Sequence, residues 1–250
     1  MTSQAGPATG GSRRADVGPI GAAIFDVDGV LLASPHERAW REALAGFADP
    51  ARFTTAMYQG VVAGKPRASG ARAALEALGV PDADRQAAAY AERKQARLEE
   101  LVHAGAVAAF PDALRLVQNI LALGWRIGVA SSSKNANAMM RPIRLPDGRS
   151  LLDAFVANVC GRDLPHGKPA PDIFLLAAAE MGAVPTRCVV VEDAAAGIEA
   201  ARAGHMAGLG VARLHDEALL EAARADLVVS SLDDVDTDRL ARGWLARRPA

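Results

Sequence analysis

The sequence predicts an α/β protein: a doubly wound parallel sheet with helices on both faces and an inserted helical segment. From Phe110 onward, short apolar runs of strand length alternate with helical patterns. The runs are apolar throughout, as in parallel strands buried on both faces. The stretch from Pro35 to about His103 carries helical patterns and almost no strand signal, so a helical cap interrupts the sheet after its first strand.

Composition predicts a globular protein without a charged partner. At 250 residues and 50% apolar content, the chain can bury one substantial core and a smaller second unit. A net charge of -1 gives no large field of one sign, so we expect no nucleic-acid or anionic-membrane partner. Cys160 and Cys188 lie far apart in apolar runs, which favours reduced core residues and a cytoplasmic location. No apolar stretch approaches the roughly 20 residues that cross a bilayer.

The chain divides into four expected parts. Residues 1–18 lack the apolar core of a secretory signal and are expected to form a disordered arm. Residues 19–33 and 108–235 form the expected core, 34–107 the cap, and 236–250 a C-terminal tail. Proline and glycine breakers separate the expected cap helices, 35–45, 50–62, 68–78 and 83–102. In the core we expect helices 111–123, 134–141, 171–181, 194–203 and 216–223, and strands 22–25, 125–130, 155–159, 188–191, 207–211 and 226–229.

Polar side chains follow the expected strands, and in such sheets ligands bind beyond the carboxyl ends of the strands. The first strand ends in Asp26 and Asp28, and the second in the segment 131–135. The third leads to Lys168, and the fourth ends in Glu192 and Asp193. We therefore expect one crevice to hold the acidic side chains that follow the first and fourth strands, the hydroxyl groups that follow the second, and Lys168.

The i, i+2 spacing of Asp26 and Asp28 places both carboxylates on one side of the strand end. Two negative charges so close together repel each other unless a cation or a proton lies between them. The pair therefore indicates a metal site or a carboxyl group held as an acid. A solvated Asp-Gly turn is the alternative, and the matching strand ends disfavour it. For phosphoryl transfer, Asp26 is the candidate nucleophile, Asp28 the acid, and Asp193 with Asp26 the Mg²⁺ ligands. Ser131 and Lys168 are the candidate donors to the phosphoryl group.

This order of motifs resembles the haloacid dehalogenase superfamily, and the helical insertion resembles the cap of its beta-phosphoglucomutase-like branch. The match runs from Ala22 to Val229 and includes Asp26, Asp28, Ser131, Lys168, Glu192 and Asp193. The resemblance implies that Asp26 is the nucleophile and Asp28 the acid/base, and that Glu192, Asp193 and the Asp28 carbonyl belong to the Mg²⁺ site. Relatives that displace halide lack the second acid, so Asp28 favours phosphoryl transfer.

The resemblance also implies contacts with substrate. Ser133, Lys134 and Asn135 match residues that hold a second, non-transferring phosphate, and they open an expected helix whose N-terminus suits an anion. Arg67 matches a cap arginine that contacts the distal phosphate, for which a planar guanidinium is well shaped. Charged side chains on exposed helices are more often solubilising, which is the alternative for Arg67.

Two further cap positions match the branch. Lys94 and Gln95 match a pair that lies near the sugar, and His36 matches a histidine that couples cap closure to the acid/base. The alternative for His36 is packing against Trp40, four residues along the same helix face.

The sequence thus predicts a Mg²⁺-dependent enzyme that acts on a small phosphorylated sugar or related metabolite through phospho-Asp26. Water as acceptor makes it a phosphatase; a sugar hydroxyl makes it a beta-phosphoglucomutase that interconverts beta-glucose 1-phosphate and glucose 6-phosphate. The linker 31–35 is shorter than the usual mutase linker and lacks its Asp-Thr element, which favours the hydrolase. A mutase must also exclude water. The alternative of another class, a non-catalytic phosphometabolite-binding protein, is disfavoured because unpaired buried carboxylates cost stability unless something uses them.

Overall fold

The computed structural model describes residues 19–145 and 147–249, so the expected arm at 1–18 lies outside the described residues. A six-stranded sheet has the order β5-β4-β1-β6-β7-β8, and every neighbouring pair is parallel. Its strands are β1 Ala22–Phe25, β4 Arg126–Val129, β5 Ala157–Asn158, β6 Cys188–Glu192, β7 Ala207–Val211 and β8 Leu227–Val229. The predicted fold class is confirmed. Strand order reverses beside β1, the position where sheets of this kind bind ligands.

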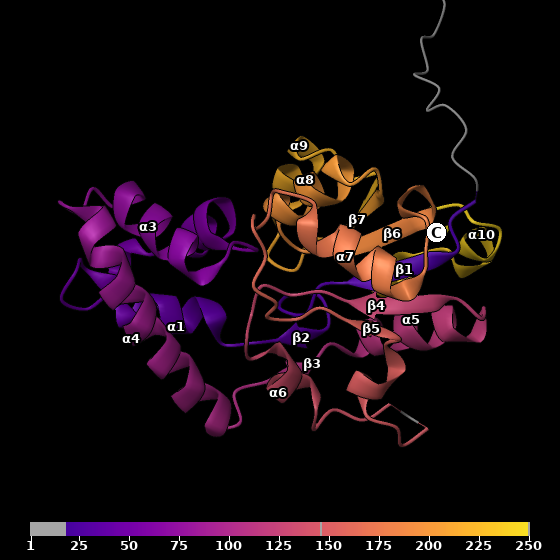
Figure 1. The fold of residues 1–250 in the computed structure, drawn as a ribbon, viewed down its shortest axis with the longest axis horizontal. Helices are drawn as coiled ribbons and strands as arrows, with labels where there is room; N and C mark the ends of the chain where they lie inside the picture. The colour runs from indigo at the N-terminus through magenta and orange to yellow at the C-terminus, as the bar shows by residue number, and fades with distance from the viewer. Residues whose placement is uncertain (1–18, 146, 250) are drawn as a thin grey trace, which may run out of the picture.

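Helices cover both faces of the sheet (Figure 1). In β1, Ala23 and Phe25 point to one hydrophobic cluster and Ala22 and Ile24 to another, as the alternation of a strand requires. The first cluster includes α5 Pro111–Ala122, α6 Ala136–Met140 and α10 Thr237–Ala241, which lies within the predicted tail. Over the other face lie α7 Asp172–Met181, α8 Ala195–Ala203 and, packed on α8, α9 Glu217–Ala222. Short 3-10 helices are Leu151–Ala154, Pro185–Arg187 and Leu232–Asp234.

The segment between the first two core strands is helical and stands to one side of the sheet (Figure 1). Its α-helices are α1 His36–Ala43, α2 Thr55–Met57, α3 Arg67–Ala77 and α4 Ala83–His103. They share a hydrophobic cluster in which the Trp40 and Tyr90 rings lie 5.1 Å apart. The chain leaves and re-enters the core through β2 Leu32–Ala33 and β3 Ala108–Ala109, which pair antiparallel. The cap is therefore joined to the sheet by a single two-stranded ribbon.

The continuous helix expected at 50–62 is wrong. The structure has a 3-10 helix at Pro50–Arg52, then α2, then a π-helix at Tyr58–Val62. The Asp49 carboxylate accepts from Ala51 N at 2.9 Å and caps the start of the first piece, and the Thr54 hydroxyl accepts from Met57 N at 3.2 Å and caps the start of the second. Between them the Phe53 side chain is fully buried in the cap cluster. This packing, which helical periodicity does not register, breaks the helix.

Two other expectations concern the chain as a whole. Cys160 and Cys188 are free and carry no disulfide, as predicted. Among the residues that the structure describes, no helix is both long and apolar enough to cross a membrane.

Candidate active site

The carboxyl ends of β1, β4 and β6 open into a cavity of about 350 Å³ beneath the cap. Most of the predicted site residues line it: Asp26, Asp28, His36, Arg67, Lys94, Ser131, Ser133, Lys134, Lys168 and Asp193. Glu192 and Asn135 lie behind this lining and contact its members. Segments from the core and from the cap thus converge on one site.

Lys168 is the buried cation of the site. Its Nζ donates to Asp26 Oδ1 and, at 2.6 Å, to Glu192 Oε1, and the three side chains are almost fully buried. Burial alone disfavours a charged amine, but the two carboxylates outweigh it and raise the pKa of Lys168 above its ordinary value. Lys168 therefore remains protonated beside Asp26.

Glu192 has both carboxylate oxygens engaged by the protein. Oε1 accepts from Lys168, and Oε2 accepts from the backbone N of Asp193 and of Ala194, each at 2.9 Å. The second set caps the start of α8. A Cβ at Gly197 would lie 1.8 Å from Oε1, so the glycine leaves room for this carboxylate. In this geometry the Glu192 side chain positions Lys168 and the loop that carries Asp193.

Replacing Lys168 by Met should strongly destabilise the fold. Asp26 and Glu192 would remain buried without their cation, a change that costs about 3–5 kcal/mol. Urea unfolding at pH 7 measures the loss. Because the unpaired carboxyl groups would have a higher pKa in the folded than in the unfolded state, lowering the pH should recover part of it.

Lys134→Met is the matched control for that prediction. Lys134 Nζ pairs with Asp163 Oδ1 at 2.9 Å, but both side chains are exposed. Surface pairs contribute about 0–1 kcal/mol, so this variant should unfold close to the wild type. Equal urea midpoints for Lys168→Met and the wild type would show that the buried triad does not stabilise the fold.

Among the described residues, the carboxyl groups around Lys168 carry more negative charge than this one lysine can balance. Burial, with the Glu192 and Asp28 charges, raises the pKa of Asp26 to about 7 despite the opposing effect of Lys168. Burial, followed by the charges of Glu192 and Asp26, raises the pKa of Asp193 well above its ordinary value. Asp28 Oδ1 is buried and has no hydrogen-bond partner among the described residues. These features fit a site that receives a cation.

The donor set itself suits a hard divalent ion. Within 19–145 and 147–249 no three His, Cys, Asp or Glu side chains are grouped closely enough to form a metal site by themselves. Asp26, Asp28 and Asp193 line the cavity and supply oxygen atoms to it. Mg²⁺ is commonly held by one or two carboxylates plus waters and substrate phosphate oxygens, so three acidic side chains are not required.

Gly29 is required by the packing of this loop. Its φ is +81°, and a Cβ there would lie 1.9 Å from Asp193 Oδ2. We expect Gly29→Ala to displace Asp193 and to lower both the melting temperature and activity. Gly79→Ala is the control, because Gly79 has φ +69° but nothing within 4 Å of the added Cβ. Both variants carry a backbone cost of about 1–2 kcal/mol, so full activity in both would contradict the role of the Gly29–Asp193 contact.

The loop after β4 presents hydroxyl groups to the cavity. Ser131 Oγ accepts from Ser133 N at 3.1 Å, and Ser133 Oγ accepts from Asn135 N at 3.2 Å. Each hydroxyl proton is left to donate elsewhere. The Asn135 amide exchanges two hydrogen bonds, of 3.2 and 3.3 Å, with the Gln95 amide of α4. This pair ties the cap to the core beside the cavity.

His36 connects a cap lysine to Asp28. Its Nδ1 lies 2.9 Å from Lys94 Nζ, and its Nε2 lies 3.5 Å from Asp28 Oδ2. Burial, together with Lys94, lowers the pKa of His36 to about 4, although Asp28 opposes the shift. Burial also lowers the pKa of Lys94 to about 7. Because the Lys94 amine donates, neutral His36 accepts at Nδ1, and its Nε2–H faces both Asp28 Oδ2 and Ser133 Oγ, each at 3.5 Å.

Some cavity residues escaped the sequence analysis: Tyr58, Arg162 and His166. Tyr58 comes from the π-helix, and burial raises its pKa well above the ordinary value, so it stays a neutral phenol. Arg162 and His166 belong to the loop that ends at Lys168. They lie several residues beyond the end of β5, so a search for polar side chains directly after strands does not find them. Arg67, by contrast, was anticipated and lies exposed on the cap side of the cavity.

An aspartate pair, a buried lysine and a strand-end serine on a doubly wound sheet define a site of the phosphoryl-transfer class. The family model described as haloacid dehalogenase-like hydrolase matches residues 20–205, and the chain belongs to this family. The predicted resemblance is therefore confirmed.

Several relatives share most of the chain. It is 32% identical to the beta-phosphoglucomutase of Mycobacterium bovis, in a match that covers 86% of this chain and 91% of the relative. It is 36% identical to the fructose-1-phosphate phosphatase YqaB of Escherichia coli, over 75% of this chain and 94% of that protein. The crystal structure of a beta-phosphoglucomutase from Pyrococcus sp. strain ST 04 matches with a TM-score of 0.68 and 30% identity, covering 88% of this chain and 96% of that one.

Proposed function

We propose that the protein is a Mg²⁺-dependent phosphatase that hydrolyses small phosphorylated sugars or related metabolites through phospho-Asp26. The observation that carries this proposal is the pairing of Asp26 with buried Lys168 next to Asp28 in one cavity. Asp28 Oδ1 is buried and has no hydrogen-bond partner among the described residues. Nucleophile, cation and acid are thus adjacent. The relatives named for fructose 1-phosphate and phosphoglucose reactions support a sugar phosphate as substrate.

The reaction has two steps. An Asp26 carboxylate oxygen forms a bond to phosphorus while the ester P–O bond breaks, and the Asp28 carboxyl group gives its proton to the leaving oxygen. Water then attacks phosphorus of the acyl phosphate, and the Asp28 carboxylate takes a proton from it. The bond from phosphorus to Asp26 breaks, so inorganic phosphate is released and the Asp26 carboxylate is regenerated.

The other residues bind and orient. Lys168 and Ser131 donate to the oxygens of the phosphoryl group that is transferred, and Glu192 holds Lys168 in place. Asp26, Asp193 and the Asp28 carbonyl would hold Mg²⁺, which when bound offsets the negative charge of the carboxylates and the phosphoryl oxygens.

The rim residues suit the rest of the substrate. Ser133, Lys134 and Arg67 line the same cavity and are the candidate residues that bind a second anionic group of the substrate. Asn135 holds Ser133 in position through its backbone N. His36 contacts Asp28, and Lys94 contacts His36, so both cap residues lie on the side of the leaving group. A phosphorylated sugar presents both an anion and hydroxyl groups to such a site.

A beta-phosphoglucomutase activity is the second candidate. The contact from Lys94 through His36 to Asp28 links a cap residue to the acid/base, and this favours a reaction that waits for cap closure. The contact forms in spite of the short linker 31–35. The linker had favoured the hydrolase, so the two observations point in different directions.

One incubation separates the candidates. Beta-glucose 1-phosphate or fructose 1-phosphate is supplied with Mg²⁺ and trace glucose 1,6-bisphosphate, and free phosphate is measured against glucose 6-phosphate. We expect free phosphate to dominate and chelation of Mg²⁺ to abolish it. Dominant glucose 6-phosphate from beta-glucose 1-phosphate would instead make the protein a mutase. Binding of the sugar phosphates without any turnover would make it the non-catalytic binding protein.

A further inference from the structure

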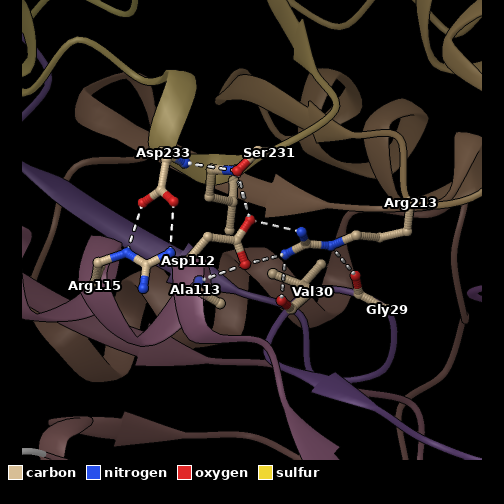
Figure 2. A network of polar contacts seen from close by, with 9 residues as sticks. Gly29, Val30, Asp112, Ala113, Arg115, Arg213, Ser231 and Asp233 are labelled. Atoms are coloured by element: carbon tan, nitrogen blue, oxygen red, sulfur yellow. Dashed lines mark hydrogen bonds and ion pairs between the residues drawn. The ribbon is translucent and has the colours of Figure 1, made fainter.

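Arg213, two residues beyond β7, forms a buried ion pair on the side of the sheet where β1 ends (Figure 2). Its Nη1 and Nη2 donate to the two carboxylate oxygens of Asp112, at 2.6 and 3.1 Å. Asp112 lies in the first turn of α5 and also accepts from Ser231 Oγ at 3.1 Å and from Leu232 N at 2.8 Å. The two side chains of the pair are 13% and 9% exposed. The guanidinium is therefore fixed in one orientation.

The same guanidinium holds the turn that follows Asp28. Arg213 Nε donates to the Gly29 carbonyl and Nη2 to the Val30 carbonyl, each at 3.3 Å (Figure 2). The turn is tight, because Leu31 N and Leu32 N both donate to the Val27 carbonyl at 2.9 Å. A shift of Gly29 or Val30 would therefore move Asp28 directly.

The same side chain also contacts the residue after β3, the second strand of the ribbon that joins the cap to the core. The guanidinium carbon lies 4.0 Å from the ring centre of Phe110, the residue after β3, and Phe110 N donates to the Leu31 carbonyl at 3.0 Å. Arg213 thus joins the Asp28 turn to the strand through which the cap returns to the core.

On the side of Arg213 the turn faces a cavity. Asp28, Gly29, Phe110 and Arg213 line a separate cavity of about 170 Å³, so the turn borders open space there. The Asp28 carboxyl group itself contacts His36 at 3.5 Å, and its Oδ1 has no hydrogen-bond partner among the described residues. The direction of the acid therefore depends on the backbone to which it is attached.

We propose that Arg213, oriented by Asp112, is a positioning residue that aims the Asp28 carboxyl group at the leaving-group oxygen; this rests on the proposed function. An arginine is needed because its planar fork binds a carboxylate with two nitrogens and still offers donors to two carbonyls. Burial acts to raise the pKa of Asp112, but the hydrogen bonds from Arg213, Leu232 and Ser231 outweigh it and hold the pKa below its ordinary value. The Asp112 carboxyl group is thus ionised at neutral pH.

The test compares two substrates in one variant, Arg213→Lys. Lysine keeps the charge opposite Asp112 but cannot make the fork. Expulsion of a sugar alkoxide needs a proton, whereas 4-nitrophenolate leaves without one, so only the first reaction depends on where Asp28 points. We expect kcat/KM for the sugar phosphate to fall about 10- to 100-fold and that for 4-nitrophenyl phosphate to fall several-fold less. The ratio of the two values does not depend on how much of a preparation is folded.

Arg115→Lys is the matched control. Arg115 donates to both Asp233 oxygens, at 2.8 and 2.6 Å, beside the same network, but the pair is about half exposed and its described contacts do not include the Asp28 turn (Figure 2). Its substrate ratio should equal that of the wild type. The double variant Asp112→Asn with Arg213→Gln removes both buried charges together and should repeat the changed ratio without leaving an unpaired ion.

Three outcomes are distinct. A changed ratio in both Arg213 variants, with an unchanged ratio in Arg115→Lys, supports the positioning role. An active wild type with the same ratio in all variants overturns it while leaving the proposed function intact. A wild type that hydrolyses neither substrate overturns the proposed function, and this inference with it.

Discussion

Asp26→Asn should abolish turnover of phosphomonoesters, with kcat reduced at least about 10³-fold. An amide oxygen is a far weaker nucleophile than a carboxylate, so the acyl phosphate on residue 26 would not form. Release of inorganic phosphate from a sugar phosphate measures the rate. Acid quenching with a phosphate-labelled substrate should trap label on the wild-type protein and none on the variant.

The fold should tolerate that substitution. Asparagine has nearly the shape of aspartate, and Lys168 keeps its 2.6 Å contact with Glu192, so the melting temperature should change little. Asp163→Asn is the control, because Asp163 also lines the cavity but is exposed and pairs with Lys134. Wild-type turnover by Asp26→Asn would show that phosphoryl transfer does not pass through this residue.

Asp28→Asn should have the second-largest effect, and the effect should depend on the leaving group. We expect kcat/KM for a sugar phosphate to fall about 10²- to 10⁴-fold, the usual contribution of a general acid. For 4-nitrophenyl phosphate the loss should be much smaller, because its leaving group is weakly basic. Steady-state kinetics with both esters over the pH range of wild-type activity make the comparison.

The pattern across variants gives this experiment its meaning. Arg213→Lys should resemble a mild form of Asp28→Asn if it acts through the same carboxyl group. Equal losses on both esters in Asp28→Asn would mean that residue 28 serves binding or folding and is not the acid. Circular dichroism of the variant confirms that the sheet is intact before such a conclusion is drawn.

Much of the core of the site followed from local sequence. Asp26, Ser131 and Asp193 come one or two residues after β1, β4 and β6, and parallel strands bring such positions to one edge of a sheet. Lys168 required only the order of the elements. The same reasoning applied one strand further, at the end of β7, would have drawn attention to Arg213.

Local reasoning was wrong where packing decided the backbone. The expected helix at 50–62 is broken because Phe53 is buried in the cap and because Asp49 and Thr54 cap separate pieces. Helical periodicity cannot register such a break, since it depends on where the neighbouring helices lie. Tyr58 lines the cavity from the π-helix that follows this break.

The sequence alone determined the α/β class, the helical insertion and the strand-end carboxylates, because each of these depends on residues that are neighbours along the chain. Only the tertiary structure decided which side chain pairs with which. Lys168 reaches Asp26 across 142 positions, and Arg213 reaches Asp112 across 101. Hydrogen bonds act over about 3 Å, so the partner of a buried charge is set by how the elements pack and not by spacing in sequence.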